Sequence, residues 1–354
     1  MAALDALLRT MLDQGGSDLH LTVGLPPKAR ISGSLKPIGD TPITAPVMES
    51  YLKEICPGKR WAEFLERKDL DLAHEVAGLA RFRANFLYNH WGQAAVFRQI
   101  PAKILSFDEL KLPEALKKLC HLDQGLVVVT GPTGSGKSTT LAAMIDDINR
   151  RVKGHILTIE DPIEFVHQRR SCLVSQREIG VHSQSFAAAL HSALREDPDV
   201  ILVGELRDLE TMSIAVTAAE MGILVMGTLH TNGAAQTVDR MVNVFPADKQ
   251  SHVRTMLSTS LRGVVSQQLL QRSDKKGRVA ALEILVNTPA VSNLIRQGKL
   301  DQLETAMQSG ASFGMRTMDS AIQALLDGRA ISGAEAYKKG INKAKFEAGK
   351  DHQS

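Results

Sequence analysis

A glycine-rich segment near the middle of the chain constrains the fold more than any other feature of the sequence. It follows an apolar, β-branched run at 126–130 and precedes a run with helical spacing at 141–145. Strand, glycine loop and helix in this order are typical of a loop whose backbone N–H groups surround phosphate oxygens. The segment has the full G-x-x-x-x-G-K-S pattern and predicts a nucleotide site made by Gly131, Pro132, Thr133, Gly134, Ser135, Gly136, Lys137, Ser138 and Thr139.

Two side chains of this loop have specific expected roles. Lys137 is expected to reach the β- and γ-phosphates, and the Ser138 hydroxyl is expected to hold Mg²⁺. A Gly/Ser-rich turn that matches the pattern by accident is the alternative, and the flanking strand and helix count against it. The loop therefore predicts ATP and Mg²⁺ as cofactors.

Composition places the chain among globular cytoplasmic proteins. Its 354 residues, 44% of them hydrophobic, allow two or three packed domains. The first residues lack the basic region and the long apolar stretch of a signal peptide, and no run approaches the length of a membrane span. Cys56, Cys120 and Cys172 form no C-x-x-C pair, so neither a disulfide framework nor a zinc site is expected. A net charge of +3 and an aromatic content of 4% count against a nucleic-acid surface.

The pattern of apolar residues divides the chain into four parts. Residues 1–100 are predicted to form a small α+β domain, in which residues 4–12 make a helix and residues 79–86 and 94–100 make strands. Apolar strands alternating with helices predict a doubly wound, mainly parallel sheet in the nucleotide domain. The expected parts are 1–100, a linker at 101–123, the nucleotide domain at 124–272 and a helical region at 273–354 with a polar tail after residue 340.

Three carboxylates follow the predicted strand at 156–159. They are Glu160, Asp161 and Glu164, and they lie just past the carboxyl end of that strand, the edge where ligands bind in open α/β sheets. Carboxylate oxygens there can hold Mg²⁺ directly or through its waters. An acidic turn facing solvent is the alternative. We assign Glu160 and Glu164 as candidate metal and catalytic residues.

A second acid follows the buried strand at 199–203. Glu205 reaches the same edge of the sheet, as in a Walker-B element, although P-loop enzymes usually have Asp where this chain has Gly204. We therefore assign metal binding to Glu160 or Glu164 and give Glu205 the role of orienting and deprotonating the attacking water. A third strand, at 224–229, leads into His230, which we interpret as a sensor of the γ-phosphate.

Four segments together resemble the secretion ATPase superfamily in order and spacing. The segment Gly15–Leu21 narrows the resemblance to the type IV pilus retraction ATPases, and the likeness extends to about residue 335. The four segments are Gly131–Thr139, Thr158–Phe165, Gly204–Thr211 and Thr228–Asn232.

The resemblance implies a homohexameric motor that powers pilus retraction and twitching motility. It implies RecA-like domains, each joined to a PAS-like N-terminal domain, with the nucleotide between the two domains of a subunit. Arg81, Arg83 and Arg98 then correspond to arginines that swing onto the phosphates, whereas the sequence alone favours a solvated basic strand face. The implied partners are an inner-membrane platform protein, through it the pilin fibre, and a paralogous retraction ATPase. The implied location is the cytoplasmic face of the inner membrane.

The chain departs from the family in one C-terminal motif. In the predicted helix at 289–298, Ser292 stands for an Arg and Gln297 for a Glu, while the apolar face is kept. An ion pair between these two positions is therefore not expected. The helix is a candidate for transmitting force, and the ordinary alternative for its apolar stripe is core packing.

Several related functions remain open. The accessory retraction paralogue shares all four nucleotide motifs, although residues 207–211 and 290–299 favour the main retraction ATPase. The assembly ATPases normally carry a paired-cysteine zinc element that this chain lacks. A scaffold subunit with an inactive site would release no phosphate, and a nucleic-acid translocase would be stimulated by DNA or RNA.

Overall fold

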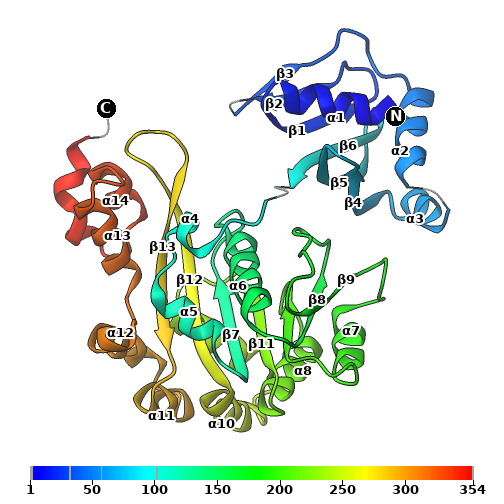
Figure 1. The fold of residues 1–354 in the computed structure, drawn as a ribbon. Coiled ribbons are helices and arrows are strands. Elements are labelled where there is room, and N and C mark those ends of the chain that lie inside the picture. The colour runs from blue at the N-terminus through cyan, green and yellow to red at the C-terminus, as the bar shows by residue number, and fades with distance from the viewer. Residues whose placement is uncertain (1–2, 32, 57, 101–102, 353–354) are drawn as a thin grey trace. The chain divides into compact units, whose positions relative to one another are not determined.

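The chain folds into two compact units, which are described separately (Figure 1). The computed structural model describes residues 3–31, 33–56, 58–100 and 103–352. The first unit comprises Met1–Lys103 together with Pro162–Val166, and the second comprises Ile104–Asp161 and His167–Ser354.

Among its described residues, the N-terminal unit comprises an antiparallel sheet and three helices. Helix α1 buries Leu4, Leu8 and Met11 on one face, as the apolar spacing predicts. The strand order is β3-β2-β1-β6-β5-β4. The elements are α1 (Ala3–Asp13), β1 (Gly16–Thr22), β2 (Lys28–Ile31), β3 (Ser34–Pro37), α2 (Ala45–Ile55), α3 (Lys59–Arg67), β4 (Asp69–Val76), β5 (Ala80–Asn89) and β6 (Gly92–Ile100).

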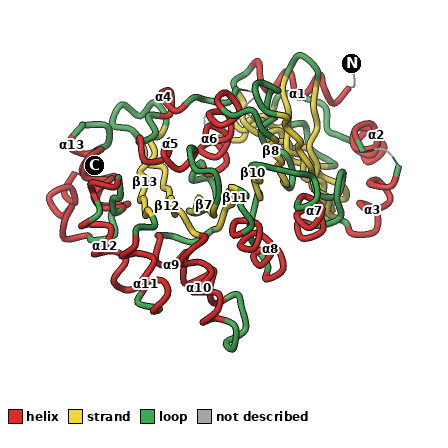
Figure 2. The backbone as a smooth tube through the Cα atoms, turned by 60° about the horizontal axis from the view of Figure 1, so that its bottom comes forward, coloured by secondary structure: helices red, strands yellow, loops and turns green. Residues whose placement is uncertain are grey.

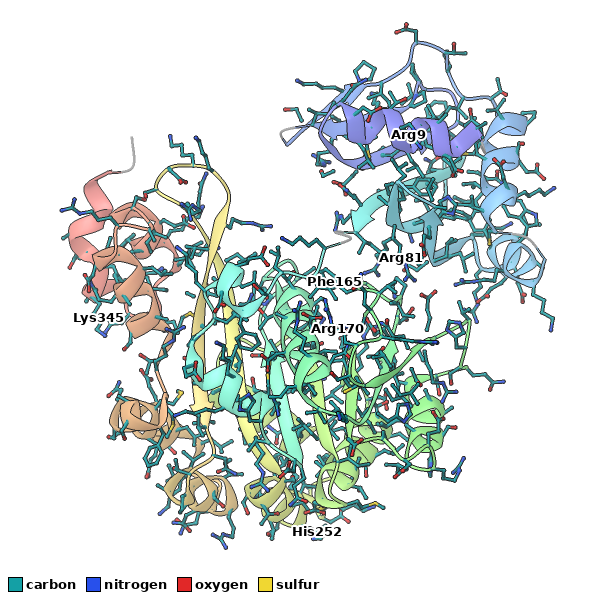
Figure 3. All side chains as sticks on the ribbon, in the orientation of Figure 1. Arg9, Arg81, Phe165, Arg170, His252 and Lys345 are labelled. Atoms are coloured by element: carbon teal, nitrogen blue, oxygen red, sulfur yellow. The ribbon has the colours of Figure 1, made fainter. Side chains whose placement is uncertain are left out.

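Strand β5 shows the alternation that its sequence predicts. Phe82 and Phe86 are fully buried, whereas Arg83 between them is exposed. Arg83 is paired with Arg98 of β6 in the antiparallel register, so both arginines lie on one face of the sheet. Arg81, labelled in Figure 3, is two residues from Arg83 on that same face.

The second unit is built on a seven-stranded sheet of order β13-β12-β7-β11-β10-β8-β9. Every pairing from β12 to β9 is parallel, and only β13 runs antiparallel to its neighbour. The strands are β7 (Gly125–Thr130), β8 (His155–Glu160), β9 (Leu173–Glu178), β10 (Val200–Val203), β11 (Leu224–Leu229), β12 (Leu261–Gln271) and β13 (Arg278–Val286).

Helices cover both faces of this sheet (Figure 2). Leu126 and Val128 of β7 pack into one hydrophobic cluster, whereas Val127 and Val129 pack into the other, so the strand is buried on both sides. This confirms the predicted doubly wound fold. Helices α4 (Phe107–Leu110), α5 (Glu114–Cys120) and α6 (Lys137–Arg151) lie on one face, and α7 (Phe186–Ala193), α8 (Leu209–Glu220), α9 (Ala234–Asn243), α10 (Gln250–Ser260), α11 (Pro289–Gln297) and α12 (Leu303–Ser309) lie on the other.

The C-terminal region differs from the expectation that it is helical from residue 273 onward. Strand β13 lies there and pairs along its whole length with β12, from Gly263 opposite Val286 to Gln271 opposite Arg278. The expected boundary at 272 therefore falls inside one β-hairpin. Periodicity alone does not separate a short apolar strand from a helix of the same length, which is why this strand was missed.

The tail also packs more than its polar composition suggests. Phe346 is 3% exposed and joins a small cluster with Leu270 of β12 and Ile322. The Asp319 carboxylate also accepts from the backbone N–H groups of Ile341 at 2.7 Å and Asn342 at 2.9 Å, so the tail packs against the preceding helices. The elements here are η1 (Leu300–Gln302), η2 (Ala311–Phe313), α13 (Met318–Asp327), α14 (Gly333–Lys339) and η3 (Lys343–His352).

Two further observations bear on composition. Cys56, Cys120 and Cys172 are buried free thiols. Among the described helices, none combines the length and the apolar character needed to cross a lipid bilayer.

Candidate nucleotide site

The glycine loop connects β7 to α6 at the carboxyl end of the central strand. Gly131 and Gly136 have positive φ angles of 138° and 89°, a conformation that side chains other than glycine rarely adopt. A Cβ atom at Gly131 would collide with the backbone oxygen of Gln267, and one at Gly136 would lie 2.8 Å from the Gln267 side-chain nitrogen. The loop therefore needs glycine both for its path and for its close approach to β12.

Gln267 holds this loop in place. Its Nε2 donates to the backbone oxygen of Ser135 at 2.7 Å, and its Oε1 accepts from Thr140 Oγ1 at 2.7 Å. The side chain is only 2% exposed, so both hydrogen bonds are shielded from water. Our sequence reasoning missed this residue, because β12 carries several polar side chains and the sequence does not mark Gln267 among them as the buried one.

Lys137, His230 and Glu205 form a connected run of polar contacts. Lys137 Nζ donates to the carbonyl oxygens of Gly131 at 2.7 Å and Pro132 at 3.2 Å, and it lies 3.4 Å from His230 Nδ1. His230 Nε2 lies 3.2 Å from Glu205 Oε1. Because an ammonium only donates, His230 Nδ1 accepts from Lys137 and Nε2 carries the proton that Glu205 accepts. The ends of two strands and one loop thus meet, as their predicted positions require.

Arg207 completes this run on the other side of Glu205. Its guanidinium Nη2 lies 2.7 Å from Glu205 Oε2, so each oxygen of the carboxylate has a partner. The Glu205 side chain is 18% exposed, whereas that of Arg207 is 67% exposed. Sequence reasoning did not assign Arg207 to the site. The i, i+2 spacing of the two residues was the available signal.

The space around Gly204 is too tight for a side chain to fit without displacing its neighbours. A Cβ atom there would lie 3.2 Å from the Ile159 oxygen and 3.3 Å from Glu160 Cα on the neighbouring strand. The Gly204 amide also donates to that oxygen of Ile159 at 2.7 Å. The crowding disfavours the usual aspartate at this position, and the backbone of Glu160 lies against the residue that precedes Glu205.

Glu160 is held by two neighbouring side chains. Its Oε1 accepts from Thr158 Oγ1 at 2.6 Å and from Gln176 Nε2 at 3.2 Å. Ser138 is a half-buried residue in the first turn of α6. A carboxylate and a hydroxyl are the hard oxygen donors that Mg²⁺ prefers, so this pair fits that ion chemically. Glu164, by contrast, lies in the short segment that groups with the N-terminal unit.

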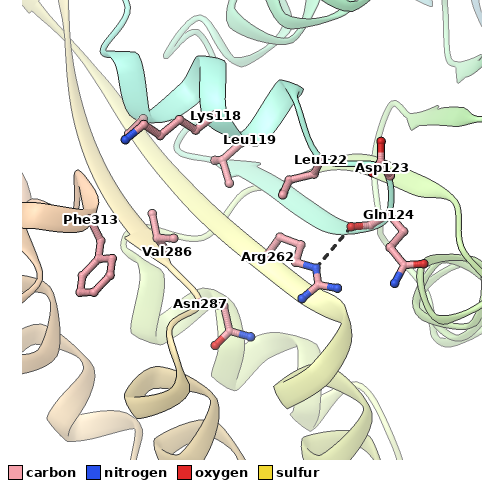
Figure 4. A pocket seen from close by; sticks show the side chains of 10 residues that line it. Lys118, Leu119, Leu122, Asp123, Gln124, Arg262, Val286, Asn287 and Phe313 are labelled. Atoms are coloured by element: carbon pink, nitrogen blue, oxygen red, sulfur yellow. Dashed lines mark hydrogen bonds between the residues drawn. The ribbon is translucent and has the colours of Figure 1, made fainter. Parts of the chain in front are cut away.

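A separate cavity of about 530 Å³ lies at the opposite end of β7 (Figure 4). It borders Gln124, which precedes β7, and Arg262, whose Nε donates to the Gln124 backbone oxygen at 3.3 Å. The glycine loop follows the carboxyl end of β7, so this cavity is not part of the nucleotide site. Its other lining residues are Ala115, Lys118, Leu119, Leu122, Asp123, Val286, Asn287 and Phe313.

Comparison with known proteins identifies the family. The family model described as type II/IV secretion system protein matches residues 4–310. The chain belongs to this family. It is 50% identical to the type IV pilus retraction ATPase PilT of Pseudomonas aeruginosa, over 94% of this chain and 96% of that protein. It is 42% identical to the type IV pilus ATPase PilU of the same organism, over 91% of this chain and 84% of that protein.

The fold comparison agrees with the sequence comparison. A crystal structure of the pilus retraction motor PilT with bound ADP matches with a TM-score of 0.90 and 43% identity, and the match covers 98% of this chain and 99% of that one. The resemblance to the secretion ATPases and the predicted fold class are therefore confirmed.

Two of the three arginines expected from the family, Arg98 and Arg83, lie beside acids of their own sheet. Arg98 Nε donates to Asp18 Oδ1 at 2.7 Å, and Arg83 Nε lies 3.7 Å from Asp71 Oδ1. Burial opposes ionisation of Asp18, but hydrogen bonds from Ser17 and Arg98 outweigh it and lower the pKa of this carboxyl. The Arg98 side chain is 70% exposed, so its guanidinium remains accessible while it is held by Asp18.

The altered motif of the family forms helix α11. Thr288 caps it and Gly298 ends it with φ at 72°, as predicted. Val291 and Ile295 are fully buried, so the apolar stripe is core packing. Ser292 Oγ donates to the Ser258 backbone oxygen at 2.7 Å, a contact within the domain.

Proposed function

We propose that this chain hydrolyses ATP at the edge formed by the glycine loop, Glu205 and His230, and that hydrolysis powers retraction of a type IV pilus. The observation that carries the proposal is that His230 contacts both Lys137 and Glu205 at the carboxyl edge of a parallel sheet. It joins a phosphate-binding lysine to a general-base candidate in a protein similar to PilT over nearly its whole length.

The triphosphate would lie against the backbone N–H groups of residues 131–139. Lys137 would exchange its loop carbonyl partners for phosphate oxygens, a stronger, charge-assisted pairing. Ser138 and Glu160 would hold Mg²⁺, with Glu164 as a further candidate ligand from the N-terminal unit. The metal ion supplies positive charge that stabilises the phosphates during transfer.

Glu205 is the group that takes the proton of the attacking water. Its two oxygens are fixed by His230 and Arg207. The carboxylate is therefore oriented before the reaction, and no conformational entropy is lost in orienting it during the reaction. His230 contacts both this base and Lys137, so a change at the phosphate site reaches Glu205 through one imidazole. This supports its role as a γ-phosphate sensor.

Arg81, Arg83 and Arg98 would add positive charge to the phosphates when the two units close on the nucleotide. The guanidinium group suits this role because it stays charged and can form two hydrogen bonds to phosphate oxygens at once. The cross-strand pairing of Arg83 with Arg98 supports a joint action, and the acids beside them keep both side chains oriented.

The motor is proposed to act as a homohexamer on the cytoplasmic face of the inner membrane. Its partners would be an inner-membrane platform protein, through it the pilin fibre, and a paralogous retraction ATPase. An accessory role like that of PilU is the second candidate, because the nucleotide motifs are shared. The higher identity to PilT than to PilU favours the primary motor.

Two measurements test this function. Lys137→Ala is expected to abolish phosphate release and weaken nucleotide binding, whereas Glu205→Gln is expected to bind ATP and hydrolyse it at least ~100-fold more slowly. Deletion of the gene in its host is expected to leave pili that assemble and do not shorten. Normal retraction in the deletion strain would exclude the primary motor role, and near-normal turnover in Glu205→Gln would remove that residue from the chemistry.

A further inference from the structure

Gln176 contacts the residues at both ends of a short segment next to the nucleotide site, the segment between Glu160 and His167. It lies on β9, opposite Thr158 of β8 in the parallel register, and is half-buried. Its Nε2 donates to Glu160 Oε1 at 3.2 Å, and its Oε1 accepts from the backbone N–H of His167 at 2.7 Å. One amide group therefore contacts the last residue of β8 and the residue where the chain returns.

Most of the segment between these two contacts groups with the N-terminal unit. The segment Pro162–Val166 groups with the N-terminal unit, whereas the residues on either side of it group with the second unit. Ile163 and Phe165 within the segment are 6% and 7% exposed. The return point is fixed as well, because the His167 side chain is only 6% exposed. The segment is thus short, anchored at both ends and buried in its middle.

The geometry of an amide makes the two contacts of Gln176 depend on each other. Its donor and acceptor atoms share one rigid plane, so a rotation that follows the His167 N–H also moves the Nε2 donor relative to Glu160. When Gln176 turns away, Glu160 Oε1 loses the Nε2 donor that helps to orient the carboxylate. A shift of the segment and a reorientation of the carboxylate are therefore linked through one side chain.

We propose that Gln176 is a positioning residue that couples the Glu160 carboxylate to the segment Pro162–Val166. The proposal rests on the proposed function, since Glu160 is expected to face the nucleotide-bound metal ion. Binding of a magnesium nucleotide fixes the carboxylate, the carboxylate fixes the amide, and the amide restrains the segment carried by the N-terminal unit. The same contacts transmit a displacement of the segment back to the nucleotide site.

The test uses the full-length protein and Mg²⁺-ADP as the probe. Hydrogen exchange of the backbone amides at 162–168 is measured with and without Mg²⁺-ADP, and ADP binding is titrated with Mg²⁺. In the parent, Mg²⁺-ADP is expected to slow exchange in this segment. Gln176→Met keeps the length of the side chain and removes both hydrogen bonds. It is expected to lose that nucleotide-dependent protection and to need ~10-fold more Mg²⁺ for half-maximal ADP binding, the lower end of the effect of removing a hydrogen-bond partner of a metal ligand.

Two controls separate positioning from folding. Gln271→Leu changes an exposed glutamine at the end of β12 and is expected to behave as the parent. Gln176→Leu repeats the loss of both hydrogen bonds with a differently shaped side chain, so agreement between the two Gln176 variants removes poor fit of either one as the cause. Parental protection and parental Mg²⁺ dependence in a folded Gln176 variant would overturn the coupling alone. A parent that does not bind Mg²⁺-ADP would overturn the proposed function and this proposal with it.

Discussion

His230 Nε2 lies 3.2 Å from Glu205 Oε1, while its Nδ1 lies 3.4 Å from Lys137 Nζ. One imidazole thus contacts both the candidate general base and the phosphate-binding lysine. The three residues come from the end of β11, the end of β10 and the start of α6. Parallel strands bring their carboxyl ends to one edge, which is why residues far apart in the sequence meet there.

Replacement of His230 by alanine is expected to lower kcat by ~10- to 100-fold with little change in KM for ATP. The reason is that His230 orients Glu205, an interaction that matters in the transition state more than in binding. Steady-state phosphate release measures both constants. The control is His252→Ala, which removes an exposed histidine on α10 (Figure 3). A rise in KM with unchanged kcat would instead make His230 a simple binding residue.

Replacement of Gly204 by alanine is expected to destabilise the second unit by about 1–3 kcal/mol, the usual cost of overpacking. The added methyl group would lie 3.2 Å from a backbone oxygen and 3.3 Å from the Glu160 Cα atom, neither of which can rotate away. Thermal unfolding measures the loss. Gly39→Ala is the matched control, because the nearest atom to a Cβ there is 3.7 Å away. Equal melting temperatures for the two variants would contradict the steric explanation of this glycine.

Replacement of Arg83 or Arg98 by alanine is expected to reduce ATP turnover more than ATP affinity. Each guanidinium would reach the phosphates mainly in the closed state, so its loss appears in the rate. Arg81→Ala is expected to act in the same direction. Arg67→Ala, which breaks a surface pair with Glu63 at the end of α3, serves as the control. Parental turnover in all three variants would contradict a role in hydrolysis and would indicate that the three arginines form only a solvated basic face of the sheet.

Stability is expected to fall as the pH is lowered through the range where histidine titrates. Burial lowers the pKa of His167 from 6.5 to about 4, against a smaller opposing effect of Asp146. In the unfolded chain His167 therefore binds a proton below about pH 6.5, whereas in the native state it stays neutral down to about pH 4. The contribution is present at neutral pH and is lost on acidification, by about 2 kcal/mol between pH 7.5 and pH 5.

Urea unfolding of the parent, of His167→Gln and of His252→Gln at several pH values measures this contribution. The His167 variant is expected to lose stability less steeply with falling pH than the parent and the His252 control. Parallel pH profiles for all three proteins would show that His167 is not the group responsible.

Exposed positions on α11 are expected to separate force output from ATP hydrolysis. Val291 and Ile295 form part of the core, so charged substitutions there would unfold the domain. Asn293→Ala and Arg296→Ala change exposed side chains and should leave a folded ATPase with parental turnover. A complementation assay is expected to show failed pilus retraction. Intact retraction by both variants would leave the helix with a structural role alone.

The local sequence was sufficient to predict the glycine loop, the parallel sheet around it and the carboxyl edge where Glu205 and His230 lie. Each of these depends on short patterns: a loop that needs glycine, β-branched strands, and polar residues directly after them. Helix α11 was predicted to within one residue because both its cap and its terminating glycine are local signals.

Tertiary structure decided which side chains hold those parts in place. Gln267 braces a loop more than 130 residues away in the chain, through its bond to Ser135. Gln176 joins Glu160 to His167. Phe346 packs into a hydrophobic cluster, although the polar composition of the tail around it predicts a solvated segment. Such contacts depend on register and packing between distant strands and helices. A local pattern carries the conformational preference of each segment, whereas the partner of a buried polar group is fixed only when the segments pack together.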